Sequence, residues 1–262
     1  MASEDLSVAS LYNIKGKIAL VTGGGSGIGA MIAAAYVQNG AKVYIASRKE
    51  KQLKEVSEAL TKKGPGSCHY IVADVSSKAV NNSGATWGAP YENVPEKEGW
   101  DRVMNLNVKS IFYLTAALTD LLAKDSNNLD PARVINVSSI ASLVAVSNDS
   151  TLASSGHGLW SYHTSKAAVN HLSATLSVTL APKFITVNCI LPGVFPSKMT
   201  AFGYKTQGKD GMANGQPMGR TGDTRDMAGL ALFLASPASA HITGVNIPID
   251  GGVTLSRTKA AL

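Results

Sequence analysis

The sequence predicts an α/β fold in which helices cover both faces of a doubly wound parallel sheet. Short runs rich in β-branched residues alternate along the chain with longer amphipathic segments, which is the pattern of parallel strands joined by helical crossovers. No internal repeat, low-complexity tract or linker divides the 262 residues, and this length suits one domain with a well-buried core. We therefore expect a single domain over residues 1–262, with an N-terminal extension at 1–14.

Six apolar runs are expected to be strands, because each is short, rich in valine and isoleucine, and bounded by glycine, proline or polar residues. In chain order the expected strands are 18–22, 42–46, 69–73, 133–137, 185–191 and 245–249.

Five longer segments are expected to be helices. The clearest carries Leu53, Val56 and Leu60 on one helical face and charged residues elsewhere. Gly40 and Pro182 end two others, as glycine and proline commonly do. In chain order the expected helices are 28–39, 49–63, 100–124, 162–180 and 223–234. Residues 192–222 have no clear period and many glycine, lysine and threonine residues, which is typical of a substrate lid.

The composition excludes several classes of protein. Hydrophobic residues make up 45% and charged residues 16%, which indicates a globular chain and leaves no apolar run long enough to span a membrane. The first residues do not resemble a secretory signal, so we expect a cytoplasmic protein. The net charge of +6 is spread without a dense basic run, so nucleic-acid binding is not expected. Cys68 and Cys189 are expected to be buried, reduced thiols.

A glycine-rich segment, Thr22-Gly-Gly-Gly-Ser-Gly-Ile-Gly29, lies directly between the first strand and the first helix. Glycines let the backbone turn tightly and approach a ligand, and a helix N-terminus offers free N–H groups to phosphate. An ordinary tight turn is the other interpretation, but the strand–turn–helix context favours a Rossmann-type dinucleotide site. The expected cofactor-binding residues here are Gly23, Gly25, Ser26, Gly27, Ile28 and Gly29.

The end of the second strand bears on which dinucleotide binds. A site for NAD places an acidic residue there, whereas arginine accommodates the 2′-phosphate of NADP. This chain has Ser47-Arg48-Lys49 at that point and no acid before Glu50. Unless Arg48 is only a solvated residue at the start of the next helix, the segment predicts NADPH as the cofactor.

A tyrosine and a lysine, Tyr162 and Lys166, are one helical turn apart and therefore share a face of the predicted helix. A neighbouring ammonium favours the phenolate and lowers a tyrosine pKa from its usual value of about 10. Ser139 follows the strand at 133–137, at the edge of the sheet where doubly wound folds bind ligands. These three residues predict acid–base chemistry on a bound substrate.

Taken together, these motifs resemble the short-chain dehydrogenase/reductase family. Within it, Thr86-Trp87-Gly88 and the segment Pro192-Gly-Val-Phe-Pro-Ser-Lys-Met-Thr200 look like the branch of 3-oxoacyl-[acyl-carrier-protein] reductases, including rhamnolipid-type members. The matches run in family order from residue 17 to 252. They are Thr22-Gly23-x-x-x-Gly27-x-Gly29, Asp74-Val75, Asn81-Asn82-Ser83-Gly84, Asn107-Val108, Ser138-Ser139, Tyr162-x-x-x-Lys166, Pro192-Gly193 and Asp250-Gly251-Gly252.

The resemblance implies roles for four catalytic residues. Tyr162 would protonate the substrate carbonyl oxygen, and Lys166 would hold the nicotinamide ribose and lower the Tyr162 pKa. Ser139 would hydrogen-bond the substrate oxygen, and Asn107 would position a water for the proton relay. Further cofactor contacts are implied at Asp74, Val75, Asn81, Asn82, Ser83, Gly84, Pro192, Gly193, Val194 and Ser197.

The chain departs from the family in two places. About ten additional residues lie between Ser139 and Tyr162, including 148–158, and they form either a specificity loop or a solvated surface loop. Asp74 and Asn81 are only seven residues apart, although a parallel crossover needs a dozen or more. The usual fourth helix and fourth strand are therefore expected to be missing there, through omission from the sequence, true deletion or replacement by a short substitute strand. The histidines lack ligand spacing, so no metal is expected.

The function predicted from these residues is NADPH-dependent reduction of a ketone, a 3-oxoacyl thioester or a related small-molecule carbonyl, to a secondary alcohol. Two alternatives remain: an NAD(P)-dependent alcohol dehydrogenase working in the oxidising direction, and an impaired deletion variant that acts only as a binding partner. The resemblance also implies a homotetramer or homodimer, with the helices at 100–124 and 162–180 packing between subunits.

Overall fold

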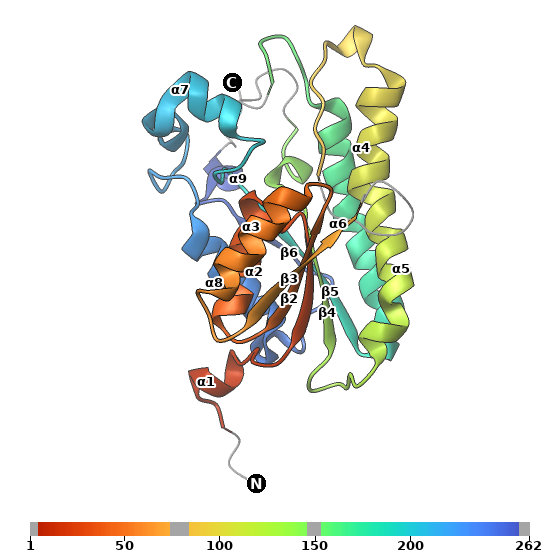
Figure 1. The fold of residues 1–262 in the computed structure, drawn as a ribbon. Helices are drawn as coiled ribbons and strands as arrows, with labels where there is room; N and C mark the ends of the chain where they lie inside the picture. Colours follow the sequence, from red (N-terminus) through yellow and green to blue (C-terminus); the bar gives the residue numbers. More distant parts are fainter. Residues whose placement is uncertain (1–4, 74–83, 146–152, 257–262) are drawn as a thin grey trace.

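The fold was obtained as a computed structural model that describes residues 5–73, 84–145 and 153–256. Six parallel strands lie between two groups of helices, with α2, α3 and α8 on one side and α5 and α6 on the other (Figure 1). This confirms the predicted α/β fold with parallel strands. The strands are β1 (Ile18–Thr22), β2 (Lys42–Ser47), β3 (Ser67–Val72), β4 (Ala132–Val137), β5 (Ile185–Pro192) and β6 (Asn246–Ile249).

The strands form two sheets of three, ordered β1-β2-β3 and β4-β5-β6. Their bounds agree with the six predicted runs to within two residues, because each run is a short apolar segment with clear stop signals. The expected missing strand would lie between β1 and β4, and Asp74, Val75, Asn81, Asn82 and Ser83 fall outside the described residues. Within the described ranges, the only β-structure between β3 and β4 is an isolated bridge at Ala89.

The five predicted helices are present, and two details differ from expectation. The principal helices are α2 (Gly27–Gln38), α3 (Glu50–Thr61), α5 (Ser110–Ala123), α6 (Trp160–Leu180), α7 (Ala201–Asn214) and α8 (Thr224–Ala235), and the short ones are α1 (Val8–Leu11), α4 (Arg102–Met104) and α9 (Val253–Ser256). The helix expected at 100–124 is divided by two π-helical stretches, Glu96–Asp101 and Asn105–Lys109. The segment 192–222 contains α7, whose polar and glycine-rich sequence has no helical period for a sequence pattern to detect.

One apolar core joins the two sheets on the side of α2 and α8. Val43 and Ile45 of β2 are fully buried there, and the same cluster contains Ile190 of β5 and Met227 of α8. A second region of the core lies between β5 and α6, where Val169 packs against Leu191. Every residue of β5 is buried, so this strand is the centre of the second sheet.

The opposite face of the first sheet is open to solvent over the described residues. Ile18 is 73% exposed, Leu20 38% and Ile71 43%. The parallel register places Leu20 beside Tyr44, and Tyr44 beside His69, so these side chains share one face. Large apolar side chains on a solvent-facing sheet normally pack against a covering helix.

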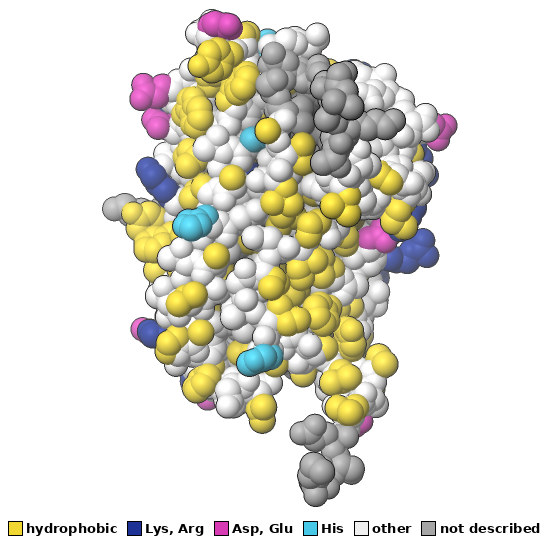
Figure 2. Space-filling model, turned by 180° about the vertical axis from the view of Figure 1, so that it is seen from behind, with side chains coloured by type: hydrophobic (Ala, Val, Ile, Leu, Met, Phe, Trp, Pro, Cys, Tyr) yellow, Lys and Arg dark blue, Asp and Glu magenta, His cyan; other side chains and the backbone are white. Residues whose placement is uncertain are grey.

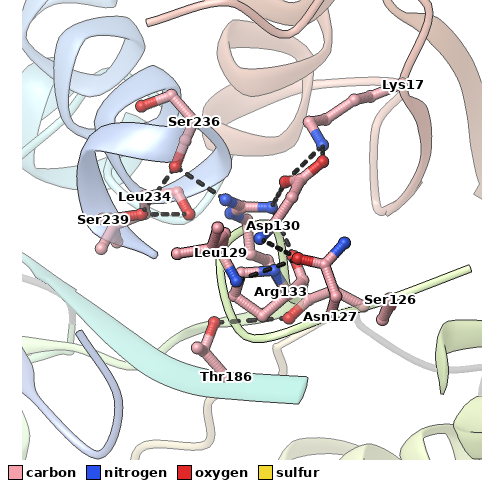
Figure 3. Close-up of polar contacts among 12 residues, drawn as sticks. Lys17, Ser126, Asn127, Leu129, Asp130, Arg133, Thr186, Leu234, Ser236 and Ser239 are labelled. Atoms are coloured by element: carbon pink, nitrogen blue, oxygen red, sulfur yellow. Dashed lines mark hydrogen bonds and ion pairs between the residues drawn. The ribbon is translucent and has the colours of Figure 1, made fainter. Parts of the chain in front are cut away.

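A polar cluster beside the start of β1 connects the two sheets at the amino ends of β1 and β4 (Figure 3). We call it the Asp130 cluster, and its members are Lys17, Asp130, Arg133 and Ser236. Lys17 Nζ lies 2.6 Å from Asp130 Oδ2, and Arg133 Nη1 lies 2.9 Å from Asp130 Oδ1. Arg133 Nη2 also donates to the Ser236 carbonyl at 2.9 Å. Burial acts to raise the pKa of Asp130, but the hydrogen bonds and charges of Lys17 and Arg133 outweigh it and lower the pKa.

Candidate active site

Tyr162 and Lys166 lie in the first turns of α6 and are both buried. The ammonium of Lys166 lies 5.7 Å from the centre of the Tyr162 ring, as the spacing of one helical turn predicts. Lys166 Nζ also donates to the carbonyl of Val137, the last residue of β4, at 2.9 Å. The lysine is thereby directed at the carboxyl end of the sheet, where a ligand of a doubly wound fold binds.

Ser139 approaches Tyr162 from a different element, the turn after β4. It lies just after β4 as the N-cap of a short 3₁₀ turn, and its hydroxyl accepts a hydrogen bond from the Ala141 N–H at 3.1 Å. The Ser139 side chain also forms a hydrogen bond with Tyr162. The structure thus brings together the serine, tyrosine and lysine that the sequence pointed to.

The pKa values at this site are governed mainly by burial. Burial raises the pKa of Tyr162, and the Ser139 hydrogen bond opposes that rise without overcoming it. Burial lowers the pKa of Lys166 to about 8, while the neighbouring Cys189 acts in the opposite direction. The expected lowering of the Tyr162 pKa by Lys166 is not found in this arrangement, because desolvation of the phenol dominates and the ammonium faces the Val137 carbonyl.

Asn107 is buried within the second π-helical stretch, and π-bulges inside helices often mark functional sites. Its side chain exchanges two hydrogen bonds with the backbone of Ala85, at 2.8 and 3.0 Å. Its Nδ2 also donates to Ser165 Oγ at 2.9 Å, and the Ser165 hydroxyl donates to the Tyr162 carbonyl at 2.8 Å. Asn107 therefore ties the segment that begins at Gly84 to the helix of Tyr162.

Gly84 is the one member of the expected Asn-Asn-Ser-Gly motif that the structure describes. A Cβ atom at Gly84 would lie 3.6 Å from Lys166 Nζ and 3.8 Å from Asn107 Oδ1. The absence of a side chain at this position keeps the space beside the lysine open. Gly84 and Lys166 thus meet at the edge of the expected cofactor site.

The glycine-rich turn after β1 is built to approach a ligand closely. A Cβ at Gly29 would lie 2.5 Å from the carbonyl oxygen of Gly23, so only glycine fits there. Ser26 caps α2 without a side-chain hydrogen bond, and this leaves its hydroxyl and the helix N-terminus available to a phosphate. At Gly25 a Cβ would meet nothing closer than 3.4 Å. These features fit the dinucleotide that the motif predicts.

Ser47, Arg48 and Lys49 flank the same cradle. Ser47 Oγ lies 3.8 Å from the position that a Cβ of Gly25 would occupy. Arg48 and Lys49 are exposed, and Arg48 forms no ion pair within the described residues. Two cations beside a phosphate cradle, without acidic partners, are suited to binding an anion.

The residues after β5 close over the cradle. A Cβ at Gly193 would lie 2.9 Å from Cα of Asp250, so Gly193 allows these two loops to touch. The Cβ of Ser197 lies 3.2 Å from the position that a Cβ of Gly27 would take, which places Ser197 against the first turn of α2. The next residue, Lys198, extends its ammonium to within 3.4 Å of Gln52 Oε1 in α3. Pro192, Gly193, Val194 and Ser197 therefore lie at the expected ligand-binding edge.

Other expectations concern side chains outside this site. Both cysteines are free and buried, as predicted. Within the described residues no group of histidine, cysteine and acidic side chains is arranged to hold a metal ion. A cavity of about 160 Å³ is lined by Phe195, Met218 and Ile249, and the candidate catalytic side chains do not line it.

Sequence reasoning missed several residues that support the site. Ser165 and Asn170 lie on the buried face of α6 and hydrogen-bond to groups around the catalytic residues, and Ser142 does so from the turn after β4. A signal was present: polar residues recur at helical spacing along one face of α6. They are Tyr162, Ser165, Lys166, Asn170, Ser173 and Ser177. A polar stripe on a helix that packs against a sheet indicates buried hydrogen bonds.

The fold and site define an oxidoreductase of the nucleotide-binding α/β class, and comparison with known proteins narrows this further. The family model described as short chain dehydrogenase matches residues 17–80, and the one described as Enoyl-(Acyl carrier protein) reductase matches residues 78–254. The chain therefore belongs to the short-chain dehydrogenase/reductase family.

Two curated relatives are 3-oxoacyl-[acyl-carrier-protein] reductases. The one for rhamnolipids biosynthesis in Pseudomonas aeruginosa is 39% identical over 93% of this chain and 98% of its own length. The FabG enzyme of Chlamydia muridarum is 31% identical over 90% of this chain and 97% of its own length.

Two solved structures resemble the fold closely. The Pseudomonas aeruginosa RhlG/NADP active-site complex has a TM-score of 0.84 and 38% identity, and the match covers 93% of this chain and 98% of that one. A short-chain type dehydrogenase/reductase from Mycobacterium marinum has a TM-score of 0.81 and 29% identity, covering 95% and 99% of the two chains.

The alignments also show how many residues of the relatives have no counterpart in this chain. The match to the Pseudomonas reductase spans 264 positions, and the 93% of this chain within it is about 244 residues, so about 20 positions hold a residue of the relative alone. The Chlamydia match spans 256 positions with 90% of this chain, about 236 residues, which again leaves about 20. The two family matches meet at residues 78–80, inside the shortened junction between Asp74 and Asn81.

Proposed function

We propose that this protein catalyses NADPH-dependent reduction of a ketone to a secondary alcohol, with a 3-oxoacyl thioester or a related carbonyl compound as substrate. The observation that carries the proposal is the meeting of Ser139, Tyr162 and Lys166 beside the glycine cradle at one edge of the fold. The two 3-oxoacyl-[acyl-carrier-protein] reductases among the relatives support the choice of substrate class.

The chain's own residues would handle the proton and the orientation of the substrate. NADPH, when bound, supplies the hydride to the carbonyl carbon. Tyr162 would donate its phenolic proton to the carbonyl oxygen, while the Ser139 hydroxyl donates a hydrogen bond to the same oxygen. The lowered pKa of Lys166, about 8, suits it to return a proton toward Tyr162.

The protonation state of Tyr162 suits it to the role of acid. Burial raises its pKa, so the phenol stays protonated at neutral pH and is ready to donate. Alcohol oxidation would instead use the phenolate as the base. The raised pKa therefore supports the role of Tyr162 as the acid in carbonyl reduction.

The choice of NADPH over NADH rests on Ser47 and Arg48. Arg48 lies beside the cradle without an ion-pair partner among the described residues and can grip a 2′-phosphate with its planar fork. The RhlG structure among the neighbours is a complex with NADP, which supports the same choice.

Assembly and location complete the proposal. Phe112 and Tyr113 of α5 and Val178 of α6 are exposed, as helices that pack between subunits would require. Figure 2 shows hydrophobic side chains gathered toward the middle of one face and charged side chains mostly at its margins. We therefore propose a homotetramer or a homodimer. A cytoplasmic location is also part of the proposal. In the described part of the chain, no helix has the length and apolar character needed to cross a bilayer.

Turnover of a 3-oxoacyl thioester with NADPH tests the function directly. Tyr162→Phe removes the donated proton and keeps the ring, so kcat should fall about 100- to 10,000-fold with little change in melting temperature. The measurement is NADPH consumption at 340 nm with acetoacetyl thioester, beside a Tyr204→Phe control in the lid. Equal turnover by wild type and Tyr162→Phe would rule out the proposed mechanism.

A further inference from the structure

A chain of hydrogen bonds connects the turn that carries Ser139 to the middle of α6. The Ser142 hydroxyl donates to the Ser139 carbonyl at 2.6 Å, and the Ser142 N–H donates to the same oxygen at 3.0 Å. The Ser142 hydroxyl in turn accepts a hydrogen bond from Nδ2 of Asn170 at 2.8 Å. We propose that Ser142 and Asn170 are positioning residues that hold Ser139 in register with Tyr162 and Lys166.

The placement of Asn170 on α6 makes this bridge effective. Asn170 follows Lys166 by four residues and Tyr162 by eight, so all three lie on the same buried face of one rigid helix. Ser139 lies on a different element, the turn after β4. The bridge therefore fixes the distance between the serine and the two residues with which it must act.

The energetic cost of burying Asn170 argues that this residue does more than fill space. Asn170 is only 9% exposed, and its Oδ1 has no hydrogen-bond partner among the described residues. A buried polar atom without a partner costs about 1–3 kcal/mol, whereas an apolar side chain of similar volume carries no such cost. An asparagine at this position is thus a poor choice for stability, and its Nδ2–H to Ser142 is the one bond that the site obtains from it.

Ser139 positioning matters because its hydrogen bond acts on Tyr162. That bond lowers the pKa of Tyr162 against the effect of burial. The titratable groups around Tyr162 are Lys166 and His163 on α6, with Cys189 of β5 next to Lys166, and none of them belongs to the bridge. A loosened Ser139 would therefore change the pH profile of turnover without altering any charged group.

The inference rests on the proposed reductase function, and the test uses the full chain. Asn170→Leu removes the bridge and keeps the volume, Ser142→Ala removes its middle member, and Ser142→Thr keeps a hydroxyl. Thr175→Ala is the matched control, because its hydroxyl donates to His171 on the same helix but lies on the exposed side. Each variant is assayed for kcat, KM, melting temperature and cofactor affinity, the last by quenching of tryptophan fluorescence.

Asn170→Leu and Ser142→Ala should each lower kcat about 10- to 100-fold, the scale of a displacement of roughly 1 Å at a reacting group. Cofactor affinity should stay at the wild-type value. The melting temperature should not fall, and it should rise in Asn170→Leu because the buried Oδ1 without a partner is removed. Ser142→Thr should restore most of the activity. The double variant should be no worse than either single one, because both remove the same bridge.

The pH profile gives an independent readout in the oxidising direction. Phenolate is required there, so the rate rises with pH through the pKa of Tyr162. Because loss of the Ser139 hydrogen bond raises that pKa, the rise should move to higher pH in Asn170→Leu. An unchanged kcat and pH profile in Asn170→Leu, or a loss of activity matched by lost folding, overturns the positioning role. Absence of activity in the wild type would instead overturn the proposed function.

Discussion

The two halves of the sheet are covered very differently. In the second half, all eight residues of β5 are buried between α6 and the core that it shares with α2 and α8. In the first half, the described residues are less buried: β1 exposes Ile18 and Leu20, and four of the six residues of β3, Ile71 among them, are exposed. The candidate catalytic side chains Ser139, Tyr162 and Lys166 belong to the covered half, and the candidate cofactor cradle belongs to the open one. The candidate catalytic residues therefore lie on a better buried part of the sheet than the candidate nucleotide site does.

The shortened junction follows directly after β3, one of the strands of the open face. The relatives hold about 20 positions that this chain does not, and the two family matches meet at residues 78–80. A segment inserted after β3 would lie beside β1 and over the face of Leu20 and Ile71. We infer that the open face is the surface that such a segment covers in the relatives.

Restoring that segment should have the largest effect on the difference in burial between the two halves of the sheet. The corresponding residues of the Pseudomonas reductase would be inserted between Asp74 and Asn81. Full burial of a large apolar side chain contributes about 1.5–3 kcal/mol, and these three side chains are on average about half exposed, so covering them should contribute about 2–5 kcal/mol in total. The melting temperature should rise by about 10 °C or more, and cofactor affinity should rise with it.

An insertion of equal length made of glycine and serine is the matched control, since it lengthens the connection without covering the face. If both insertions give the same melting temperature, the open face does not explain the difference between the two halves. An intact mass of the protein from its native cells is a second check. A value of 27.2 kDa corresponds to this chain, and one about 2 kDa heavier to about 20 further residues.

Arg48 offers a smaller change confined to the open half. Arg48→Ala removes the guanidinium proposed to hold the 2′-phosphate, a charge-assisted interaction of about 1.5–3 kcal/mol. KM for NADPH should rise about 10- to 100-fold, while KM for NADH stays the same. Steady-state kinetics with both cofactors measures this, with Lys51→Ala as a control on the same surface. Parallel changes in both KM values would contradict the assignment.

The smallest effect is expected at the Asp130 cluster, which links the two halves. The folded-state pKa of Asp130 lies below its usual value, so the cluster stabilises the fold at pH values above about 4 and loses this contribution as the pH falls through the folded pKa. Asp130 is nearly half exposed, so Lys17→Met should cost less than about 1 kcal/mol at pH 7. Denaturant unfolding at pH 7 and pH 3 measures the difference, which should be smaller at pH 3. An equal cost at both values would mean that the ion pair is not its source.

The sequence patterns predicted most of the molecule correctly. Strands and helices follow from local runs and stop signals, and the glycine segment, Ser139, Tyr162 and Lys166 follow from motifs whose spacing is set by one turn or one helix. The hydrogen bonds of Asn107 with Ala85, and the bridge of Ser142 and Asn170, could not be read this way. Their partners are distant in the sequence, and only packing of separate elements brings them together.

The sequence by itself determined the family and the order of the strands along the chain, because these depend on residue types at short spacing. It predicted the reacting groups from patterns of the same kind. Only the tertiary structure determined the directions of the pKa shifts at the site and the difference in burial between the two halves of the sheet. The pKa values of Tyr162 and Lys166 depend on burial, which is a property of the assembled core. Exposure of Ile18 and Leu20 likewise depends on what packs over them, and no local pattern encodes that.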